Sequence, residues 1–291
     1  MTELAKTMSA VMAVVMVIIG IWYVSAVALN SRWEYDQAAR AGTQIGTAEV
    51  IERTLAQERP MLPAPHQVLA GLWQGVTGYA ITSKRSLVYH AGVTLSATLA
   101  GFALGTAAGL LLAIGIVYSR AMDMSVMPWA IASQTIPVLA IAPMVIVVLA
   151  SVGVKGLLPK ALIAAWLSFF PVLVGMIKGL RAPDGMQMDL LRTYNAAPVQ
   201  TFFRLRLPMS MPYLFASLKV GITAALVGTI VAELPAGATA GLGARLLSGS
   251  YYGQTIQIWS ALFAAAILAA VLVAIVGLAE RAVLRAMGMA R

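Results

Sequence analysis

The stretch Met188-Asp-Leu-Leu-Arg-Thr-Tyr-Asn-Ala-Ala-Pro-Val-Gln-Thr-Phe-Phe-Arg-Leu-Arg-Leu-Pro208 is a polar, basic interruption between two strongly apolar segments. Residues 187–194 can form a short helix, and Asn195 follows where a helix turns into the left-handed conformation, which Asn tolerates better than any residue except Gly. Pro198 fits the first turn of a second helix, because its missing N–H has no helical partner there. The stretch predicts a helix–turn–helix knob that projects from a membrane, apolar on one side and charged on the other.

The composition is that of a polytopic membrane protein. Apolar residues make up 60% of the 291 residues and charged residues only 11%, which is unlike a soluble domain. The net charge of +9 comes from basic residues in loops between apolar segments, which favours membrane orientation over nucleic-acid binding. The absence of Cys excludes a disulfide framework and a thiolate site. We therefore expect an all-α membrane protein without a nucleic-acid partner.

About six transmembrane helices are predicted, because six apolar segments can cross a hydrocarbon core of about 30 Å. They are residues 7–30, 91–118, 124–154, 161–177, 213–232 and 256–278. The first segment has a rival interpretation as a cleaved signal, since Ala26-Val27-Ala28 resembles a signal-peptidase site. Its apolar run, however, exceeds the roughly 7–15 residues of a signal core.

The distribution of basic residues predicts the orientation. Six spans put both termini on one face, whose short loops hold Lys6, Arg120, Lys178, Arg181, Arg192, Arg204, Arg206, Arg281, Arg285 and Arg291. The short loops opposite hold only Lys155, Lys160 and Arg245. Cytoplasmic loops carry the excess of Lys and Arg. Both termini and the 188–208 stretch are therefore expected in the cytoplasm.

Three regions follow from this topology. Residues 1–30 form an N-terminal transmembrane helix, and residues 31–85, rich in mixed charge, form a periplasmic loop with a little helix. From His66 onward, Val68, Leu69, Leu72, Trp73 and Val76 share one helical face, which suits either a helix lying in the membrane interface or a small packed helix. Residues 86–291 form a five-helix core with a cytoplasmic loop at 184–208, and residues 236–253, rich in Gly and Ser, are expected to be an extramembrane loop.

Small residues and prolines mark two features inside the spans. Gly101, Gly105 and Gly109 recur at four-residue steps, which lets another helix approach closely in lipid. Pro137 and Pro143 should bend or break the 124–154 segment. Irregular backbone at membrane depth is tolerated in buried protein or along a cavity. Two interpretations of this segment stay open: a translocation pathway lined by Gln134, Thr135 and Pro137, or a proline-kinked packing helix.

Glu233 is an acid at the end of the 213–232 span. It could pair across a dimer, shape an outer gate, or meet water. We include Glu233 among the candidate pathway residues. Lys219, in the same span, lies near the loop end and is expected to snorkel to the interface.

The 188–208 stretch resembles the cytoplasmic loop of the permease subunits of bacterial ABC importers, whose pattern is E-A-A-x3-G-x9-I-x-L-P. Asp replaces Glu, two Leu replace the two Ala, Asn replaces Gly and Leu replaces Ile, each keeping the physical property. Residues 134–143 and Val231-Ala-Glu-Leu234 are most similar to the nitrate, sulfonate and taurine group. The resemblance covers about Pro63 to the C-terminus. Every spacing of the loop pattern is kept by Asp189, Leu190, Leu191, Asn195, Leu205, Leu207 and Pro208.

The resemblance implies the type I ABC importer permease fold and a transport subunit, not an enzyme. Its loop would be a coupling helix seated on a separate ATPase subunit, which carries ATP and Mg²⁺. The implied assembly has two permeases, identical or related, two ATP-binding subunits, and a periplasmic or lipid-anchored substrate-binding protein in a bacterial inner membrane. The substrate would be nitrate-, sulfonate- or taurine-like, or a pyrimidine or vitamin-precursor heterocycle. The expected coupling residues are Asp189, Leu190, Leu191, Asn195, Ala196, Arg204, Leu207 and Pro208.

Missing motifs narrow the alternatives. No G-x-x-x-x-G-K-[ST] occurs, so any ATP hydrolysis must come from another polypeptide. No run of intramembrane carboxylates or His points to an ion-coupled carrier, and the two distant His with scattered acids predict no metal site. An ion-coupled secondary transporter working without an ATPase is the alternative function, and a purely structural membrane subunit is a second one.

Overall fold

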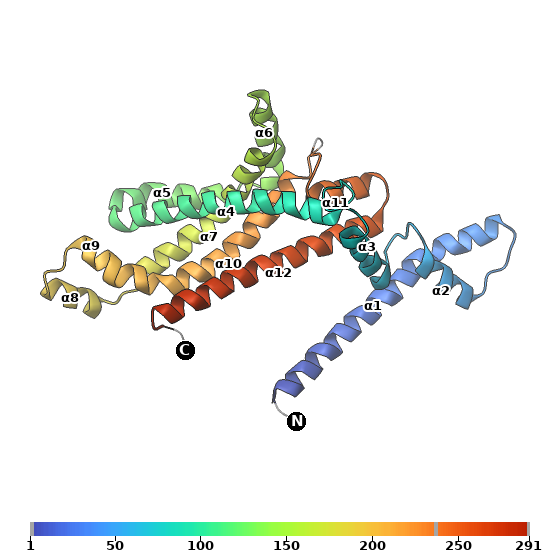
Figure 1. Cartoon of the computed structure of the whole chain (residues 1–291), viewed down its shortest axis with the longest axis horizontal. Coiled ribbons are helices and arrows are strands. Elements are labelled where there is room, and N and C mark those ends of the chain that lie inside the picture. The colour runs from blue at the N-terminus through green and yellow to red at the C-terminus, as the bar shows by residue number, and fades with distance from the viewer. Residues whose placement is uncertain (1–2, 236–237, 290–291) are drawn as a thin grey trace. The chain divides into compact units, whose positions relative to one another are not determined.

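The computed structural model describes residues 3–235 and 238–289, and every regular element in those ranges is a helix (Figure 1). The elements are α1 (Glu3–Arg40), α2 (Thr47–Ala56), α3 (Pro65–Thr77), α4 (Leu87–Tyr118), α5 (Arg120–Ser133), α6 (Val138–Ser151), α7 (Leu157–Leu180), α8 (Gly185–Thr193), α9 (Pro198–Thr201), the π-helix η1 (Phe202–Arg206), α10 (Leu207–Ala232), α11 (Leu242–Tyr251) and α12 (Thr255–Ala286). The predicted all-α class is confirmed. Arg291, which entered the orientation argument, lies outside the described residues.

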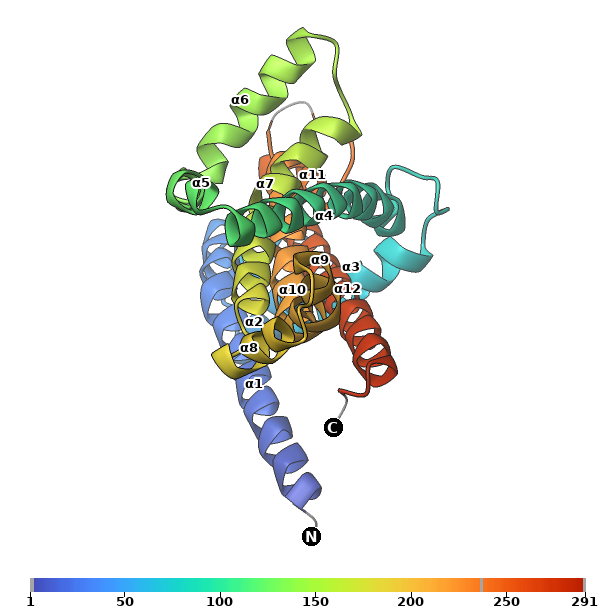
Figure 2. The same ribbon diagram turned by 90° about the vertical axis from the view of Figure 1, so that its left-hand side faces the viewer.

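Five segments are long and apolar enough to cross a membrane. They are Lys6–Arg40, Leu87–Tyr118, Leu157–Leu180, Pro198–Ala232 and Thr255–Ala286. A sixth span, as predicted, results only if α5 and α6 are taken together, and these two helices are bent by 96° at the break between them. In both views the pair forms an angled arm (Figures 1 and 2), and α6 packs on α7 and α10 through Ala142, Ile163 and Ala232.

The bend lies at one of the two prolines expected to cause it. Pro137 caps the start of α6, and the backbone N–H groups of Gln134 and Thr135 bond only three residues back, at 3.1 Å each. Proline has no N–H and disfavours helix in the residue before it, so α5 cannot run into α6. Pro143 lies inside α6, which continues past it to Ser151.

The chain divides into two compact units. The first comprises Met1–Tyr89 and Arg245–Ala264, and the second comprises His90–Ala244 and Ala265–Arg291. The membrane-spanning core of the second unit is built on α7, which contributes more buried residues than any other described helix. In both views α7 runs alongside α10 (Figures 1 and 2).

Glycines bring α4 and α7 into backbone contact. A Cβ added to Gly101 would lie 2.4 Å from Ala164 Cβ, and one added to Gly105 would lie 2.1 Å from Ser168 Oγ. At Gly109 the same atom would meet Phe169 O at 2.7 Å. In lipid, where apolar burial between helices gives little drive, such close packing stabilises helix association. The predicted role of the three glycines in packing is confirmed.

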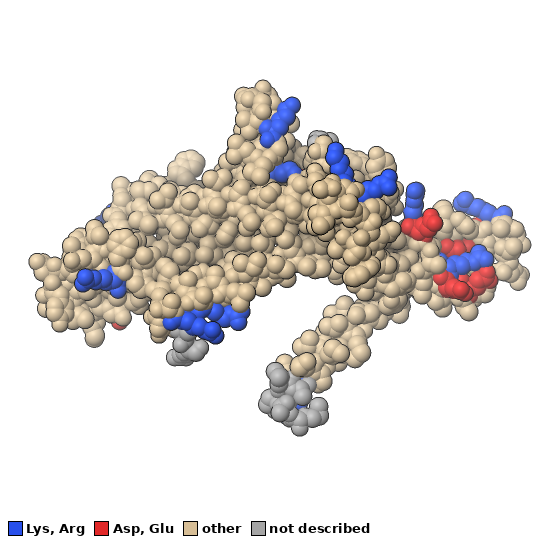
Figure 3. Space-filling view, viewed as in Figure 1, with Lys and Arg blue, Asp and Glu red and all other residues tan. Residues whose placement is uncertain are grey.

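In the first unit, α1 is joined to the segment between α2 and α3. Asn30 Nδ2 donates to Leu62 O at 2.8 Å, and Trp22 Nε1 donates to Pro63 O at 3.0 Å. The Trp22 ring also packs on Trp259 of α12, with 5.0 Å between centroids. Acidic and basic side chains gather over α2 and the end of α1, whereas the surface over the long helices is largely uncharged (Figure 3).

Helix α3 matches the predicted apolar face from residue 66 onward. Val68 is buried, while Leu69, Trp73 and Val76 are exposed. A helix with an uncovered apolar stripe is the kind that lies in a membrane interface. The choice between an interfacial and a packed helix stays a prediction.

Two expectations about the extramembrane regions need correction. Residues 236–253 were expected to be a loop, yet Leu242–Tyr251 form α11. Residues 236 and 237 of that segment lie outside the described residues. Gly243 allows the backbone of α11 to lie close to that of α10, since a Cβ on Gly243 would lie 2.4 Å from Ile230 O. In addition, α1 continues as helix to Arg40, well into the predicted polar region.

Candidate functional site

The 184–208 loop is a capped helix followed by a tight turn. Asp184 Oδ1 accepts from Gln187 N at 2.7 Å, and Gln187 Oε1 accepts from Asp184 N at 3.2 Å, forming a capping box at the start of α8. At the other end, Asn195 has φ 51° and is the one non-glycine residue with positive φ among those described. Its N–H bonds Arg192 O at 2.9 Å, while Ala196 N bonds Leu191 O at 3.0 Å. This is a Schellman motif with Asn in the left-handed position, as predicted.

The loop presents apolar side chains to its surroundings. Tyr194 is 76% exposed, and the other members of the set are also uncovered: Met186, Leu190, Val199 and Phe203. Asp189 is exposed on α8 and paired with Arg192 at 2.9 Å within the same helix. Leu191 and Ala196 are half-buried. Large exposed apolar residues concentrated on one extramembrane feature mark an interaction surface.

The loop is joined to the spans through η1. Leu207 N–H donates to Phe202 O, five residues back, in a helix whose next turns contain Pro208 and Pro212, which lack N–H groups. The guanidinium of Arg206 lies over the Tyr118 ring at 5.4 Å, and the Tyr118 and Phe202 rings meet edge-on at 6.1 Å. The end of α4 is thus in contact with the segment that connects the loop to α10.

The predicted pathway residues at the α5–α6 break are accessible. Thr135 and Pro137 are exposed and Gln134 is half-buried. Thr135 Oγ1 donates to Ala132 O at 2.8 Å, and Gln134 Nε2 donates to Ser133 Oγ at 3.2 Å. These bonds are local, so the side chains hold the turn and do not tie it to another helix.

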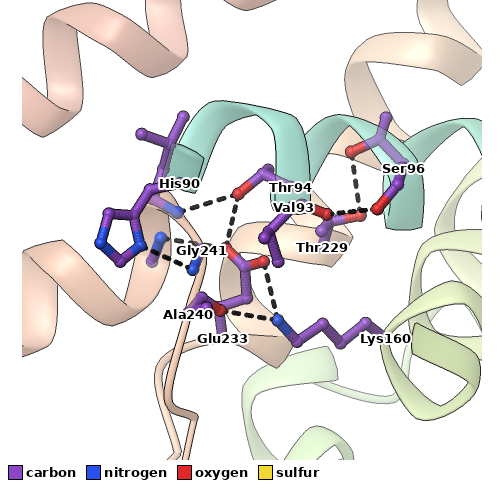
Figure 4. A network of polar contacts seen from close by, with 12 residues as sticks. His90, Val93, Thr94, Ser96, Lys160, Thr229, Glu233, Ala240 and Gly241 are labelled. Carbon is purple, nitrogen blue, oxygen red and sulfur yellow. Dashed lines mark hydrogen bonds and ion pairs between the residues drawn. The ribbon is translucent and has the colours of Figure 1, made fainter. Parts of the chain in front are cut away.

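Glu233 is fully buried, so of the three alternatives considered for it contact with water is wrong, whereas pairing across a dimer and shaping an outer gate stay predictions. Its side chain is 0% exposed and forms a 3.0 Å ion pair with Lys160 of α7. The same carboxylate accepts from Thr94 Oγ1 at 2.9 Å and from Gly243 N at 3.1 Å (Figure 4). Lys160 Nζ also donates to Ala240 O at 2.8 Å. The carboxylate is therefore compensated inside its own unit, as a buried charge must be.

The chain around this carboxylate is held by three backbone amides in succession. Gly241 N donates to His90 Nδ1 at 2.9 Å, Leu242 N to Thr94 Oγ1 at 2.8 Å, and Gly243 N to Glu233. A Cβ on Gly241, which has φ 125°, would lie 2.0 Å from the Glu233 carboxyl carbon. Only glycine fits there. The network fastens the start of α11 to α4, α7 and α10.

Comparison with known proteins gives the family. Residues 105–288, which include the 184–208 loop, match the family described as "Binding-protein-dependent transport system inner membrane component". The chain belongs to this family. It is therefore an ABC importer permease subunit and a multi-pass inner membrane protein of the type I fold.

Relatives of this permease are named for different substrates. It is 31% identical over 225 residues to the riboflavin transport system permease protein of Chloroflexus aurantiacus, covering 77% of this chain and 80% of the relative. Identity to the formylaminopyrimidine transport permease protein of Halalkalibacterium halodurans is 30%, covering 67% and 73%. Identity to the putative aliphatic sulfonates transport permease protein of Bacillus subtilis is 24%, covering 77% and 86%.

Sequence reasoning about the permease missed the partners of Glu233. The sequence places Lys160 in an outer loop only, and Thr94 and His90 belong to no motif. Thr94 lies 139 positions and Lys160 lies 73 positions from Glu233. One signal in the sequence points to the pair: Glu233 and Lys160 both lie at span ends on the same predicted face, where opposite charges can meet. Lys219 forms an ion pair with Glu280 of α12, and its predicted snorkelling to the interface stays a prediction.

Metal chemistry has no support in the described residues. Residues 3–235 and 238–289 contain no group of three or more His, Cys, Asp or Glu side chains that could hold a metal ion.

Proposed function

We propose that the permease couples solute movement to ATP hydrolysis in a separate subunit through the 184–208 loop. The observation that carries this proposal is the exposed apolar face of a loop whose backbone is pinned at both ends of α8. A docking element must hold its shape when pushed, and capping at Asp184 and the turn at Asn195 supply that rigidity. Asp189, Leu190, Asn195 and Arg204 are the contacts we assign to the ATPase subunit, with Leu191, Ala196, Leu207 and Pro208 supporting them.

Movement of the loop would reach the membrane through two contacts. The chain continues without a break from η1 into α10, and the Arg206 and Phe202 side chains contact the Tyr118 ring at the end of α4. Displacing the loop therefore displaces α4 and α10 together. These helices both pack on α7, so their joint motion would rock the core between inward- and outward-facing states.

The assembly we propose has two permease subunits and two ATP-binding subunits, with ATP and Mg²⁺ held by the latter. A substrate-binding protein delivers solute on the outer face. Both termini and the loop lie in the cytoplasm, which requires the bent α5–α6 pair to count as one crossing. The basic residues Arg192, Arg204 and Arg206 on and beside the loop support that side.

The pathway is assigned to Gln134, Thr135 and Pro137, at the break between α5 and α6. Val138, at the start of α6, packs in one cluster with Val231 and Ala232, which immediately precede Glu233. The pathway turn and the Glu233 network therefore lie on neighbouring helix ends. We assign Glu233 to the outer end of the pathway as a latch, with Lys160 as its partner.

The proposed substrate is a small organic solute. The relatives are named for riboflavin, formylaminopyrimidine and aliphatic sulfonates, so they support the class of small organic solutes and not one compound. Polar hydrogen-bonding groups at the pathway turn, an amide and a hydroxyl, suit solutes with several acceptors and donors.

The test uses two substitutions, one of which has a matched control. Asp189→Arg reverses the charge on the exposed face of α8, and Asn195→Val places a β-branched residue at φ 51°, at a cost of about 1–2 kcal/mol. Asn195→Gly, which keeps the left-handed turn, is the control. Both test variants should insert normally yet lose the ATPase subunit on purification or uncouple its hydrolysis from uptake.

Full ATP-driven transport by both variants, in membranes where the chain is present at its normal level, would refute the coupling assignment. The alternative of an ion-coupled carrier is tested in the same preparation. Solute uptake by the permease alone, driven by an ion gradient without any ATPase subunit, would favour it.

A further inference from the structure

The first unit contains a polar pocket that the proposed coupling and pathway do not use. Its volume is about 300 Å³, and it is lined by α3, the segments before and after α3, the first residue of α4, α11, and the start of α12 with the residue before it. That volume suits a small solute. Every residue of the lining belongs to the first unit.

The charge of the lining is unbalanced. Arg59, Arg85 and Arg245 all line the pocket, and Glu58 is its one carboxylate. None of these four side chains takes part in an ion pair in the part of the chain that the structure describes. Three guanidinium groups facing one cavity repel one another unless an anion lies between them.

Arg245 is the most constrained of the three. Its Nε is buried and has no hydrogen-bond partner among the described residues. An unsatisfied buried donor costs about 1–3 kcal/mol, and more on a charged group. Burial lowers the pKa of the Arg245 guanidinium, with the nearby Tyr79 acting in the opposite direction. Arginine nevertheless stays charged in proteins, so its Nε calls for an acceptor that residues 3–235 and 238–289 do not provide.

The walls that hold Arg245 are rigid. Gln257 Nε2 donates to Arg245 O at 3.1 Å and to Ser248 Oγ at 2.9 Å, which joins α11 to α12. A Cβ on Gly71 would lie 2.7 Å from Ser260 Oγ, and one on Gly75 would lie 2.5 Å from Leu87 Cδ1, so α3 packs closely on its neighbours. A fixed cavity binds a ligand without the cost of ordering its own side chains.

We propose that this pocket binds a small organic anion, a carboxylate or sulfonate, with its acidic group on Arg245. Arg59 and Arg85, both exposed, attract the anion at the rim, and the guanidinium fork matches the oxygens of such a group. The amides of Gln74 and Gln254 and the Leu87 and Ile256 side chains receive the rest of the molecule. The inference deepens the proposed function, on which it rests for placing the pocket on the outer face as a receiving site for solute.

The experiment measures binding to the purified full chain in phosphatidylcholine nanodiscs, by isothermal titration calorimetry. The probes are ethanesulfonate, propionate and neutral propionamide. At least one of the two anions should bind one per chain, and propionamide should bind at least tenfold more weakly. Arg245→Gln should weaken anion binding at least tenfold, as expected for loss of a charge-assisted bond.

Two further variants keep the result interpretable. Arg40→Gln removes a positive charge from the same unit, outside the pocket lining, and should leave the affinity unchanged. Arg85→Gln, at the exposed rim, should keep the fold and still weaken binding about threefold or more. Helical circular dichroism and gel filtration verify that each variant is folded and not aggregated.

Three outcomes would overturn the proposal. They are no saturable binding of either anion, equal binding of propionamide, or equal affinities in Arg245→Gln and Arg40→Gln. A fourth comes from nanodiscs that contain phosphatidylglycerol: if that lipid abolishes anion binding, the pocket holds a lipid headgroup. Because no ATPase subunit is present, failure of the coupling proposal would leave these results unchanged, and loss of binding would leave the coupling tests unchanged.

Discussion

Replacing Lys160 by Met tests the buried network most directly. The substitution keeps the length of the side chain but removes the cation that compensates Glu233. The carboxylate, which is 0% exposed, then retains only the neutral donors Thr94 Oγ1 at 2.9 Å and Gly243 N at 3.1 Å. Removing one member of a buried ion pair in this way lowers the free energy of unfolding by about 3–5 kcal/mol.

Replacing the acidic partner, Glu233, should lower the free energy of unfolding by less. In Glu233→Gln the remaining Lys160 side chain is 14% exposed and still donates to Ala240 O at 2.8 Å. We expect a loss of about 1–3 kcal/mol there. The double variant has no stranded charge, so it should be more stable than Lys160→Met alone. The two substitutions should therefore be coupled by about 2–3 kcal/mol.

The free energy of unfolding would be measured by titrating the purified chain with sodium dodecyl sulfate in mixed micelles and following helical circular dichroism. Hydrogen exchange of residues 238–244 gives a local readout, because the amides of Gly241, Leu242 and Gly243 belong to the network. Lys155→Met, at an exposed site in the preceding loop, is the control and should stay within about 0.5 kcal/mol. Additive effects of the two network substitutions, with unchanged exchange of residues 238–244, would refute the reasoning.

Two other substitutions test the packing of the second unit. Gly105→Ala should destabilise the core by about 1–3 kcal/mol, because the new Cβ would lie 2.1 Å from Ser168 Oγ. Gly92→Ala in the same helix is the control, since its Cβ would meet nothing within 4 Å. Equal unfolding midpoints for the two variants would contradict the α4–α7 contact. Tyr118→Leu removes the ring below Arg206 and the edge contact with Phe202, for a loss of about 1–3 kcal/mol. The same titration measures this loss of stability, and an unshifted midpoint would show that the contact of Arg206 and Phe202 with α4 does not stabilise the unit.

The local structure of the loop could be predicted because it depends on neighbours in sequence. Asn195 sits at φ 51° where the apolar pattern of α8 ends, and Pro198 begins α9 at its first position. Capping boxes, left-handed turns and proline positions are decided within a few residues. The same holds for Gly101, Gly105 and Gly109, whose spacing alone places them on one face of α4.

The predictions that were wrong concern segments where long-range contacts override local preference. The glycines around Gly243 are typical of a loop, yet α11 forms because the amides of Gly241, Leu242 and Gly243 bond His90, Thr94 and Glu233 elsewhere in the unit. Tertiary contacts of this kind outweigh the roughly 1 kcal/mol by which glycine disfavours helix. The count of spans met a similar limit, since composition cannot give the 96° between α5 and α6.

The sequence by itself determined that the chain is a helical membrane protein, where its long apolar helices run, and which loop projects as a capped turn. Those properties follow from hydropathy, helical period and the backbone chemistry of single residues. Only the tertiary structure decided what compensates Glu233 and which arginines face one pocket. Lys160 lies 73 positions from Glu233, and Arg59, Arg85 and Arg245 come from separate segments. Charges so distant along the chain meet only when packing fixes the helices that carry them.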